Sequence, residues 1–325
     1  MPKKIYDSPE IWSIDVPLPN NPLRNLNCYV VRAGDETLVI DTGFRQPECA
    51  EALFGGLKEL GVDLTKTKLF LTHLHSDHTG LIGDFAEAGS KIYMGEVDLE
   101  QFFSMRELSD RFALFDDEGF PQDDGRQQMA KNPAIIYAPT NIKLTGSVTD
   151  GQEFKVGDLS FTCIHTPGHT PGHVCLYLAS EQIMFLGDHI LFDITPNITM
   201  WIGVKDSLGD YLNSLDKIEQ YPIKLALPAH RNNAKDVYLR IAEIRAHHDQ
   251  RLQNTLDIIT ANPGANAHDI ASKMKWSMRG RDWSEFPVHQ KWFAMGETIA
   301  HLNYLLYKDK ITKTMVDGVY QYNLA

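Results

Sequence analysis

Four side chains that can bind a metal ion lie within six residues of one another, directly after a short apolar run at 68–71. They are His73, His75, Asp77 and His78. Neutral imidazole and carboxylate groups are typical ligands of zinc, iron and manganese. In a loop that follows a strand, such side chains can converge on one point. The block therefore predicts a metal site rather than a polar loop with solvated histidines.

A second ion requires ligands from elsewhere, because four groups in one loop cannot enclose two ions. His169 lies in a Thr-Pro-Gly-His-Thr-Pro-Gly-His block that follows an apolar run at 161–164. Asp188 and His230 each come shortly after another apolar run. Because all three follow expected strands by a few positions, we expect them to emerge at the same edge of a sheet.

These segments together resemble the metallo-β-lactamase fold superfamily, over about residues 10–250. The resemblance implies an α/β fold, a four-layered αβ/βα sandwich, with a site for two divalent metal ions. It implies that one ion is held by His73, His75 and His169, that the other is held by Asp77, His78 and His230, and that Asp188 bridges them. It also implies that Asp41 supports the ligand loop by hydrogen bonding. Zinc is the first expectation, with iron or manganese as alternatives.

This ligand set favours hydrolysis. Coordination lowers the pKa of water from ~15.7 to about 7, so hydroxide is available near neutral pH without a strong base. Two ions about 3.5–4 Å apart share a hydroxide and stabilise an oxyanion. Asp77 is the candidate catalytic residue, placed to orient the hydroxide or pass a proton to the leaving group. We therefore expect a dinuclear metal-dependent hydrolase that attacks an ester-like bond with a metal-bridging hydroxide.

The resemblance also narrows the substrate. Zinc β-lactamases usually lack the bridging aspartate, so Asp188 argues against antibiotic hydrolysis. The layout is similar to the lactamase-beta-2-like group, in which a hydrolase core precedes a winged-helix tail. Members of that group resemble either thioesterases or RNA nucleases, and the ligands alone cannot separate the two. A thioester, lactone or similar acyl substrate is the first expectation, and a ribonuclease or phosphodiesterase is the alternative. A DNA-contacting regulatory protein with a vestigial site is less favoured.

The chain is expected to form two domains, with a break at Asn262-Pro263-Gly264. Residues 1–260 are the expected catalytic domain, in which strand, helix and strand signals alternate and a long amphipathic helix covers 234–260. Residues 96–150 are expected to be irregular, either a lid over the site or an insertion that only packs on the core. Four residues there suggest an apolar pocket, namely Phe102, Phe103, Met105 and Phe115.

Residues 261–325 are expected to be a winged-helix-like domain. A helix begins near Asn266, a second covers 292–306, and 311–324 alternate around Asp317-Gly318 as in a hairpin. Basic and acidic side chains nearly balance in this tail, so it gives no strong electrostatic signal for nucleic acid. A role in dimerisation or in covering the pocket is therefore expected ahead of DNA binding.

The composition argues against a nucleic-acid-binding protein, a membrane-spanning protein and a secreted protein. The formal net charge of −12 over 325 residues disfavours a broad nucleic-acid surface, so a small acyl substrate is the expected partner. Nucleic acid stays open but is not favoured, and a homodimer is also left open. No apolar stretch approaches the ~20 residues of a membrane span. The start of the sequence has no apolar signal core, and the four cysteines form no disulfide framework, so a cytoplasmic protein is expected.

Overall fold

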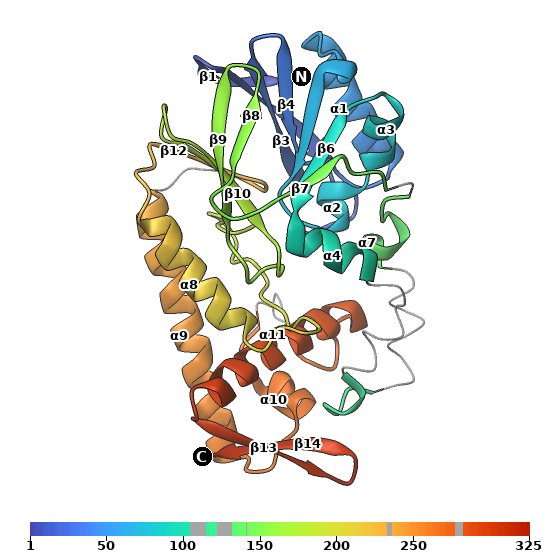
Figure 1. Cartoon of the computed structure of the whole chain (residues 1–325). Helices are drawn as coiled ribbons and strands as arrows, with labels where there is room; N and C mark the ends of the chain where they lie inside the picture. Colours follow the sequence, from blue (N-terminus) through green and yellow to red (C-terminus); the bar gives the residue numbers. More distant parts are fainter. Residues whose placement is uncertain (105–114, 122–131, 141, 233–235, 277–281) are drawn as a thin grey trace.

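Two β-sheets face each other in the computed structural model, and helices cover their outer faces (Figure 1). The structure describes residues 1–104, 115–121, 132–140, 142–232, 236–276 and 282–325. Three separate hydrophobic clusters fill the spaces between the layers. The cluster between the sheets contains aromatic residues of both, including Tyr29, Phe70 and Phe185. The predicted α/β sandwich of four layers is confirmed.

The first sheet has seven strands in the order of the sequence. They are β1 (Lys3–Asp7), β2 (Glu10–Pro17), β3 (Asn25–Ala33), β4 (Glu36–Ile40), β5 (Thr67–Leu71), β6 (Lys91–Gly95) and β7 (Gly146–Val148). Strands β1 to β4 pair antiparallel, and β4 to β7 pair parallel. Its outer face packs on α1 (Pro47–Glu59) and α3 (Ile82–Glu87), and the short α2 (Ser76–Thr79) follows β5.

The second sheet has five strands in the order β12-β11-β10-β9-β8. They are β8 (Glu153–Val156), β9 (Leu159–His165), β10 (Val174–Leu178), β11 (Ile183–Gly187) and β12 (Leu225–Pro228). All pairs are antiparallel except β11 with β12. Its outer face packs on α8 (Ser207–Glu219) and α9 (Val237–Ala261). The last of these corresponds to the long helix predicted over 234–260.

The C-terminal segment contains α10 (Ala267–Lys273), α11 (Val288–Tyr307) and a hairpin of β13 (Ile311–Val316) and β14 (Val319–Leu324). The side chain of Asn266 accepts a hydrogen bond from the Asp269 amide, which caps α10 as the spacing predicted. Asp317 and Gly318 have positive φ angles of 50° and 83°, as a tight hairpin turn requires. The helices share the hydrophobic cluster of the second sheet. The winged-helix assignment and the domain boundary at 260 stay predictions.

The insertion over 96–150 differs from expectation in one place. Residues 146–148 were expected to be irregular, yet they form β7 and complete the first sheet beside β6. Phe115 is 3% exposed and its ring lies 5.1 Å from that of Trp292 in α11, which fits the alternative of packing on the core. Two short helices, α4 (Glu96–Ser104) and α7 (Pro133–Ile136), complete the described part. Met105 lies outside the described residues, and the lid role stays a prediction.

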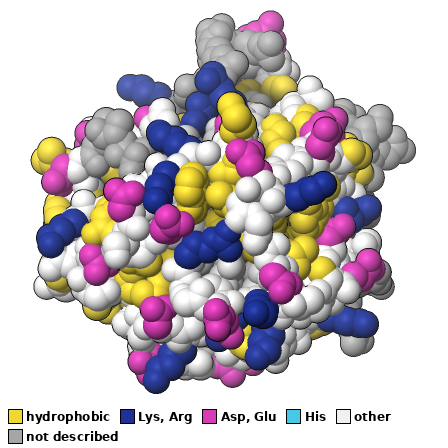
Figure 2. All heavy atoms as spheres, turned by 90° about the horizontal axis from the view of Figure 1, so that it is seen from above, with side chains coloured by type: hydrophobic (Ala, Val, Ile, Leu, Met, Phe, Trp, Pro, Cys, Tyr) yellow, Lys and Arg dark blue, Asp and Glu magenta, His cyan; other side chains and the backbone are white. Residues whose placement is uncertain are grey.

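The surface gives no sign of a single dominant charge on the face drawn in Figure 2, where acidic and basic side chains are interspersed. No histidine is visible among the described atoms of that face. The histidines among the metal-ligand candidates are therefore not visible on that face. Among the described ranges, no helix has both the length and the apolar character needed to cross a membrane.

Candidate metal centre

The predicted ligands come from four loops that follow strands β5, β9, β11 and β12. The loop after β5 carries four of them, and its last part turns into α2. His169 lies in the loop between β9 and β10, Asp188 directly follows β11, and His230 follows β12. The structure brings all seven predicted ligands together in three overlapping groups, His73 with His75 and His169, His73 with His78 and Asp188, and Asp77 with His78 and His230.

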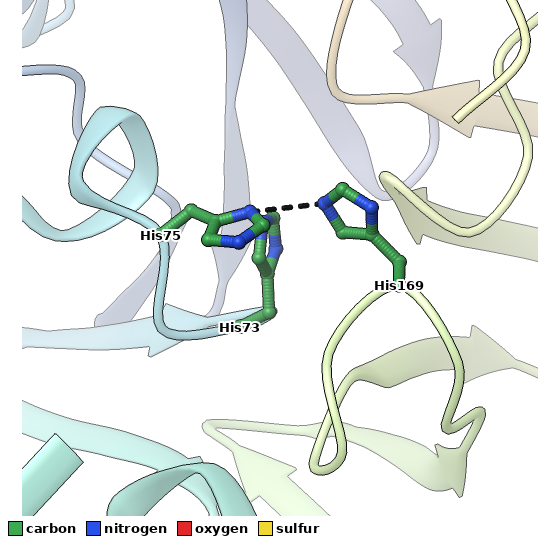
Figure 3. Close-up of side chains that lie close together, drawn as sticks. All are labelled: His73, His75 and His169. Atoms are coloured by element: carbon green, nitrogen blue, oxygen red, sulfur yellow. Dashed lines mark hydrogen bonds between the residues drawn. The ribbon is translucent and has the colours of Figure 1, made fainter. Parts of the chain in front are cut away.

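Three histidines form the first group. Nδ1 of His75 lies 3.0 Å from Nε2 of His73 and 3.0 Å from Nε2 of His169. Figure 3 shows the rings of His75 and His169 pointing toward each other from opposite sides of the centre. Three imidazole nitrogens that converge at such distances form a cradle for one cation.

The group of Asp77, His78 and His230 contains a carboxylate and lies beside the three histidines. Oδ2 of Asp77 lies 3.5 Å from Nε2 of His230 and 3.9 Å from Nε2 of His78. Both histidines are completely buried, and Asp77 is nearly so. Two imidazoles and a carboxylate again form a donor set suited to a divalent transition metal.

Asp188 lies between the two groups. Its Oδ2 is 3.5 Å from Nε2 of His169, and its Oδ1 is 3.4 Å from Nε2 of His230 and 3.7 Å from Nε2 of His78. Burial alone would raise the pKa of this carboxyl, but the adjacent His230 and His78 outweigh burial and hold its pKa well below the usual range. The group is therefore a carboxylate with one oxygen facing each set of histidines.

The remote ring nitrogens of four histidines are held by hydrogen bonds. Nδ1 of His169 donates to the carbonyl of Asn197 at 2.8 Å, and Nδ1 of His230 donates to the carbonyl of Asn25 at 2.7 Å. A carbonyl oxygen can only accept, so these two rings carry the proton on Nδ1 and present a lone pair on Nε2. Nδ1 of His73 pairs with Thr72, and Nδ1 of His78 pairs with Asp41. Such partners fix the orientation of metal-ligating histidines.

Unpaired atoms at the centre test whether metal ions suit these residues. Nε2 of His78, Nε2 of His230 and Oδ1 of Asp188 are buried and have no hydrogen-bond partner within the described parts of the chain. Buried polar atoms without partners are costly and uncommon. A bound cation would satisfy all three atoms, so the donor set and the orphaned atoms both fit divalent metal ions.

Two electrostatic effects oppose each other at the histidines. Burial lowers the pKa of His73 well below its ordinary value, so that ring stays neutral and able to coordinate. At His78, burial also lowers the pKa, but the carboxylates of Asp41, Asp188 and Asp77 raise it well above the ordinary value. That side of the centre therefore attracts positive charge, which a metal ion can supply in place of a proton.

Asp41 has the position expected of a supporting residue. Its φ of 61° lies in the left-handed region, and its Oδ1 accepts a hydrogen bond from the amide of Thr72 at 2.9 Å. Its Oδ2 lies 2.9 Å from Nδ1 of His78. One carboxylate thus connects the end of β4 to both ends of the ligand loop.

Two further residues position the centre. Nε2 of His173 accepts a hydrogen bond from the amide of Asp188 at 3.1 Å, so this buried ring holds the backbone of the residue that lies between the two groups. Asp98 was missed by the sequence analysis. Its carboxylate accepts hydrogen bonds from the amide of Leu74 and the hydroxyl of Thr170, and burial raises its pKa to about 6. Asp98 therefore connects two ligand loops, yet a lone aspartate at a helix start carries no sequence signal.

Comparison with family models gives two matches. Residues 22–230 match the model described as Metallo-beta-lactamase superfamily. Residues 282–325 match the model described as Metallo-beta-lactamase-like, C-terminal domain. The first match contains every predicted ligand, from His73 to His230.

Curated relatives include fungal enzymes. An atrochrysone carboxyl ACP thioesterase of Aspergillus chevalieri is 29% identical over 243 residues, which cover 74% of this chain and 61% of the relative. The lactamase-like protein adaB of Aspergillus niger is 26% identical over 238 residues, which cover 72% of this chain and 58% of the relative. The chain thus spans about three-fifths of the length of these relatives.

Solved structures match along nearly the whole chain. A metallo-beta-lactamase family protein from Thermus thermophilus has a TM-score of 0.81 and 27% identity, and covers 97% of this chain and 98% of its own. A beta-lactamase domain protein from Burkholderia ambifaria has the same TM-score with 24% identity. That match covers 100% of this chain and 93% of the Burkholderia chain. The second likeness concerns the fold alone. Because the family model spans well over half of the sequence, the chain belongs to the metallo-beta-lactamase superfamily.

Proposed function

We propose that this chain is a dinuclear metal-dependent hydrolase and that it cleaves a thioester, or a closely related ester bond, of a small acyl substrate. The observation that carries the proposal is the position of Asp188. Each of its oxygens faces a different group of histidines, at 3.5 Å from His169 and 3.4 Å from His230. A carboxylate in that position is suited to bridging two cations.

The proposed ligands follow from the two groups. His73, His75 and His169 would hold one ion, Asp77, His78 and His230 would hold the other, and Asp188 would contact both. Zinc is the first candidate because it accepts imidazole and carboxylate ligands and its filled d shell imposes no geometry of its own, with iron or manganese as alternatives. The proposed division of the chain is a catalytic domain over 1–260 and a winged-helix-like domain over 261–325.

When bound, such ions lower the pKa of water and polarise a carbonyl oxygen. The chain supplies the remaining requirements. Nε2 lone pairs are directed inward because Asn197 and Asn25 hold the opposite ring nitrogens. Asp77 is proposed to orient the attacking hydroxide or to pass a proton to the leaving group, because its carboxylate lies beside the rings of His78 and His230. Burial of the histidines excludes bulk water, which strengthens the electrostatic interactions at the centre.

The thioester class rests on the relatives. Several of them are named as thioesterases that act on acyl groups carried by an acyl carrier protein. A thioester carbonyl is an electrophile that this donor set can activate. The acidic net charge of −12 favours a small substrate over a polyanionic nucleic acid.

The test combines metal analysis with a choice of substrates. The full chain is loaded with zinc, and thiol release is measured with a panel of acyl-CoA and acyl-pantetheine thioesters, beside a gel assay with single-stranded RNA. We expect two zinc ions per chain and thioester cleavage that Asp188→Ala abolishes, while Asp84→Ala on the exposed side of α3 keeps full activity. One ion or none would overturn the dinuclear assignment. RNA cleavage without thioester cleavage would overturn the substrate class.

A further inference from the structure

The loop segment 197–201 touches two histidines of the three-histidine group. The carbonyl of Asn197 accepts the hydrogen bond from Nδ1 of His169 at 2.8 Å. At the other end of the segment, Nε1 of Trp201 donates to the carbonyl of His169 at 3.1 Å. Both the ring and the backbone of one ligand are therefore held by the same five-residue segment.

Trp201 also contacts a second ligand. Its ring stacks on that of His75, with centroids 6.0 Å apart and an interplanar angle of 27°. The indole is only 8% exposed, and it packs in the cluster of the first sheet. His75 belongs to the loop after β5 and His169 to the loop between β9 and β10, so Trp201 connects ligands contributed by the two different sheets.

The same segment is held from its other side by the C-terminal helix. The amide of Met200 donates to the carbonyl of Gly296 in α11 at 3.2 Å. A Cβ atom on Gly296 would approach Oγ1 of Thr199 more closely than real Cβ atoms do. Helix and loop are therefore in direct backbone contact at a place where any residue larger than glycine would press on the side chain of Thr199. Ser207, at the start of α8, adds a hydrogen bond to the carbonyl of Thr199 at 2.7 Å.

We propose that Trp201 is a positioning residue for the three-histidine group and that Gly296 of α11 holds it there through the 197–201 segment. The inference rests on the proposed metal centre. Helix α11 contributes none of the proposed ligands. The inference nevertheless gives this helix a role in the affinity with which one of the two positions binds its metal ion. Groups that orient a ligand in this way typically alter metal affinity by about 10–100-fold when they are removed.

The test measures zinc affinity rather than activity. Two variants of the full chain are compared with wild type by competition with a chromophoric chelator, which resolves successive equivalents of zinc. Trp201→Phe keeps an aromatic ring beside His75 but removes the Nε1–H that His169 accepts. Gly296→Ala adds a methyl group at the contact with Thr199 while improving helix propensity by about 1 kcal/mol, so it should not unfold α11.

Gly55→Ala in α1 is the matched control, because it is also a helical glycine and no atom lies within 4 Å of its added Cβ. We expect Trp201→Phe and Gly296→Ala each to weaken one zinc equivalent by about tenfold or more and to leave the other unchanged. Cobalt loading should show altered visible absorption for the same position. If the Gly296→Ala variant binds zinc as tightly as the Gly55→Ala control, the link to α11 is overturned. If the Trp201→Phe variant keeps the zinc affinity of wild type, the positioning role of Trp201 is overturned. If wild type itself binds no zinc, the proposed function fails together with this inference.

Discussion

Oδ2 of Asp41 lies 2.9 Å from Nδ1 of His78, and both side chains are almost completely buried. Burial lowers the pKa of His78, and the carboxylate of Asp41 is the largest of the charges that raise it. It also accepts a hydrogen bond from the Thr72 amide, so it fixes the loop and the ring together. A single buried carboxylate thus sets the ring orientation and the basicity of one proposed ligand.

Asp41→Asn should lower zinc affinity by about 10–100-fold. Asparagine keeps the size of the side chain, but it removes the negative charge that makes His78 a stronger ligand. The measurement is chelator competition at neutral pH, with Asp35→Asn in the exposed turn before β4 as the control. Unchanged affinity in Asp41→Asn would contradict the role of this carboxylate.

Removing the metal from wild type should lower its stability. The three orphaned atoms of His78, His230 and Asp188 would lose their partner, and a ligand at about 1,000 times its Kd stabilises a folded protein by about 4 kcal/mol. Thermal unfolding is measured with saturating zinc and after chelation. Asp188→Ala should show a much smaller difference between the two conditions. An equal difference in wild type and variant would mean that Asp188 takes no part in binding.

The site was predictable to the extent that its residues form local blocks. The loop at 73–78 is such a block, and His169, Asp188 and His230 follow apolar runs that the structure shows as β9, β11 and β12. The roles of Asp98 and Trp201 were harder to predict from the sequence, because neither residue belongs to a motif. Each acts through a hydrogen bond to the backbone of a ligand loop. The contacts of Trp201 with His169 and His75 become visible only in the folded structure.

The same reasoning applies to the fold. Helix α1 is recognisable from its proline at the start and from Gly61 shortly after its end, and the hairpin is recognisable from Asp317-Gly318. Strand β7 is only three residues long, and its pairing with β6 depends on a chain segment about fifty residues away. Short strands of that kind are determined by tertiary contacts that local sequence does not encode.

Lys313→Met should destabilise the protein by roughly 3 kcal/mol, because it leaves the carboxylate of Glu118 buried without a charged partner. Nζ of Lys313 lies 2.6 Å from Oε1 of Glu118, a residue that is 4% exposed. Oε2 of the same carboxylate accepts a hydrogen bond from the hydroxyl of Tyr322 at 2.8 Å. This pair ties the described segment 115–121 to the terminal hairpin. The free energy of unfolding is measured in urea.

Lys155→Met provides the control for this pair. Lys155 and Glu153 form an ion pair at 3.3 Å in which both side chains are well exposed, so its loss should cost at most about 1 kcal/mol. Equal effects of the two substitutions would show that burial adds nothing to the Glu118 pair.

A buried histidine pair predicts the pH dependence of stability. Nδ1 of His301 donates to the carbonyl of Glu297 at 2.7 Å, so its Nε2 accepts from Nδ1 of His248, 3.2 Å away. Burial, together with the neighbouring His301, lowers the pKa of His248 to about 2. The folded state therefore keeps this ring neutral at pH values where the unfolded chain, with a pKa of about 6.5, takes up a proton.

Because the folded pKa is depressed, the unfolded state binds more protons below about pH 6.5, and stability falls as the pH is lowered. For His248 this loss amounts to roughly 2 kcal/mol between about pH 8 and pH 5.

His248→Phe should remove that part of the pH dependence, although it also lowers stability at every pH by leaving His301 without its donor. Tyr211→Phe, in contact with the same ring, is the control because it adds no titration in this range. The three proteins share all metal ligands, so differences between their urea unfolding curves at the two pH values report His248 alone. Equal losses in wild type and His248→Phe would refute the prediction.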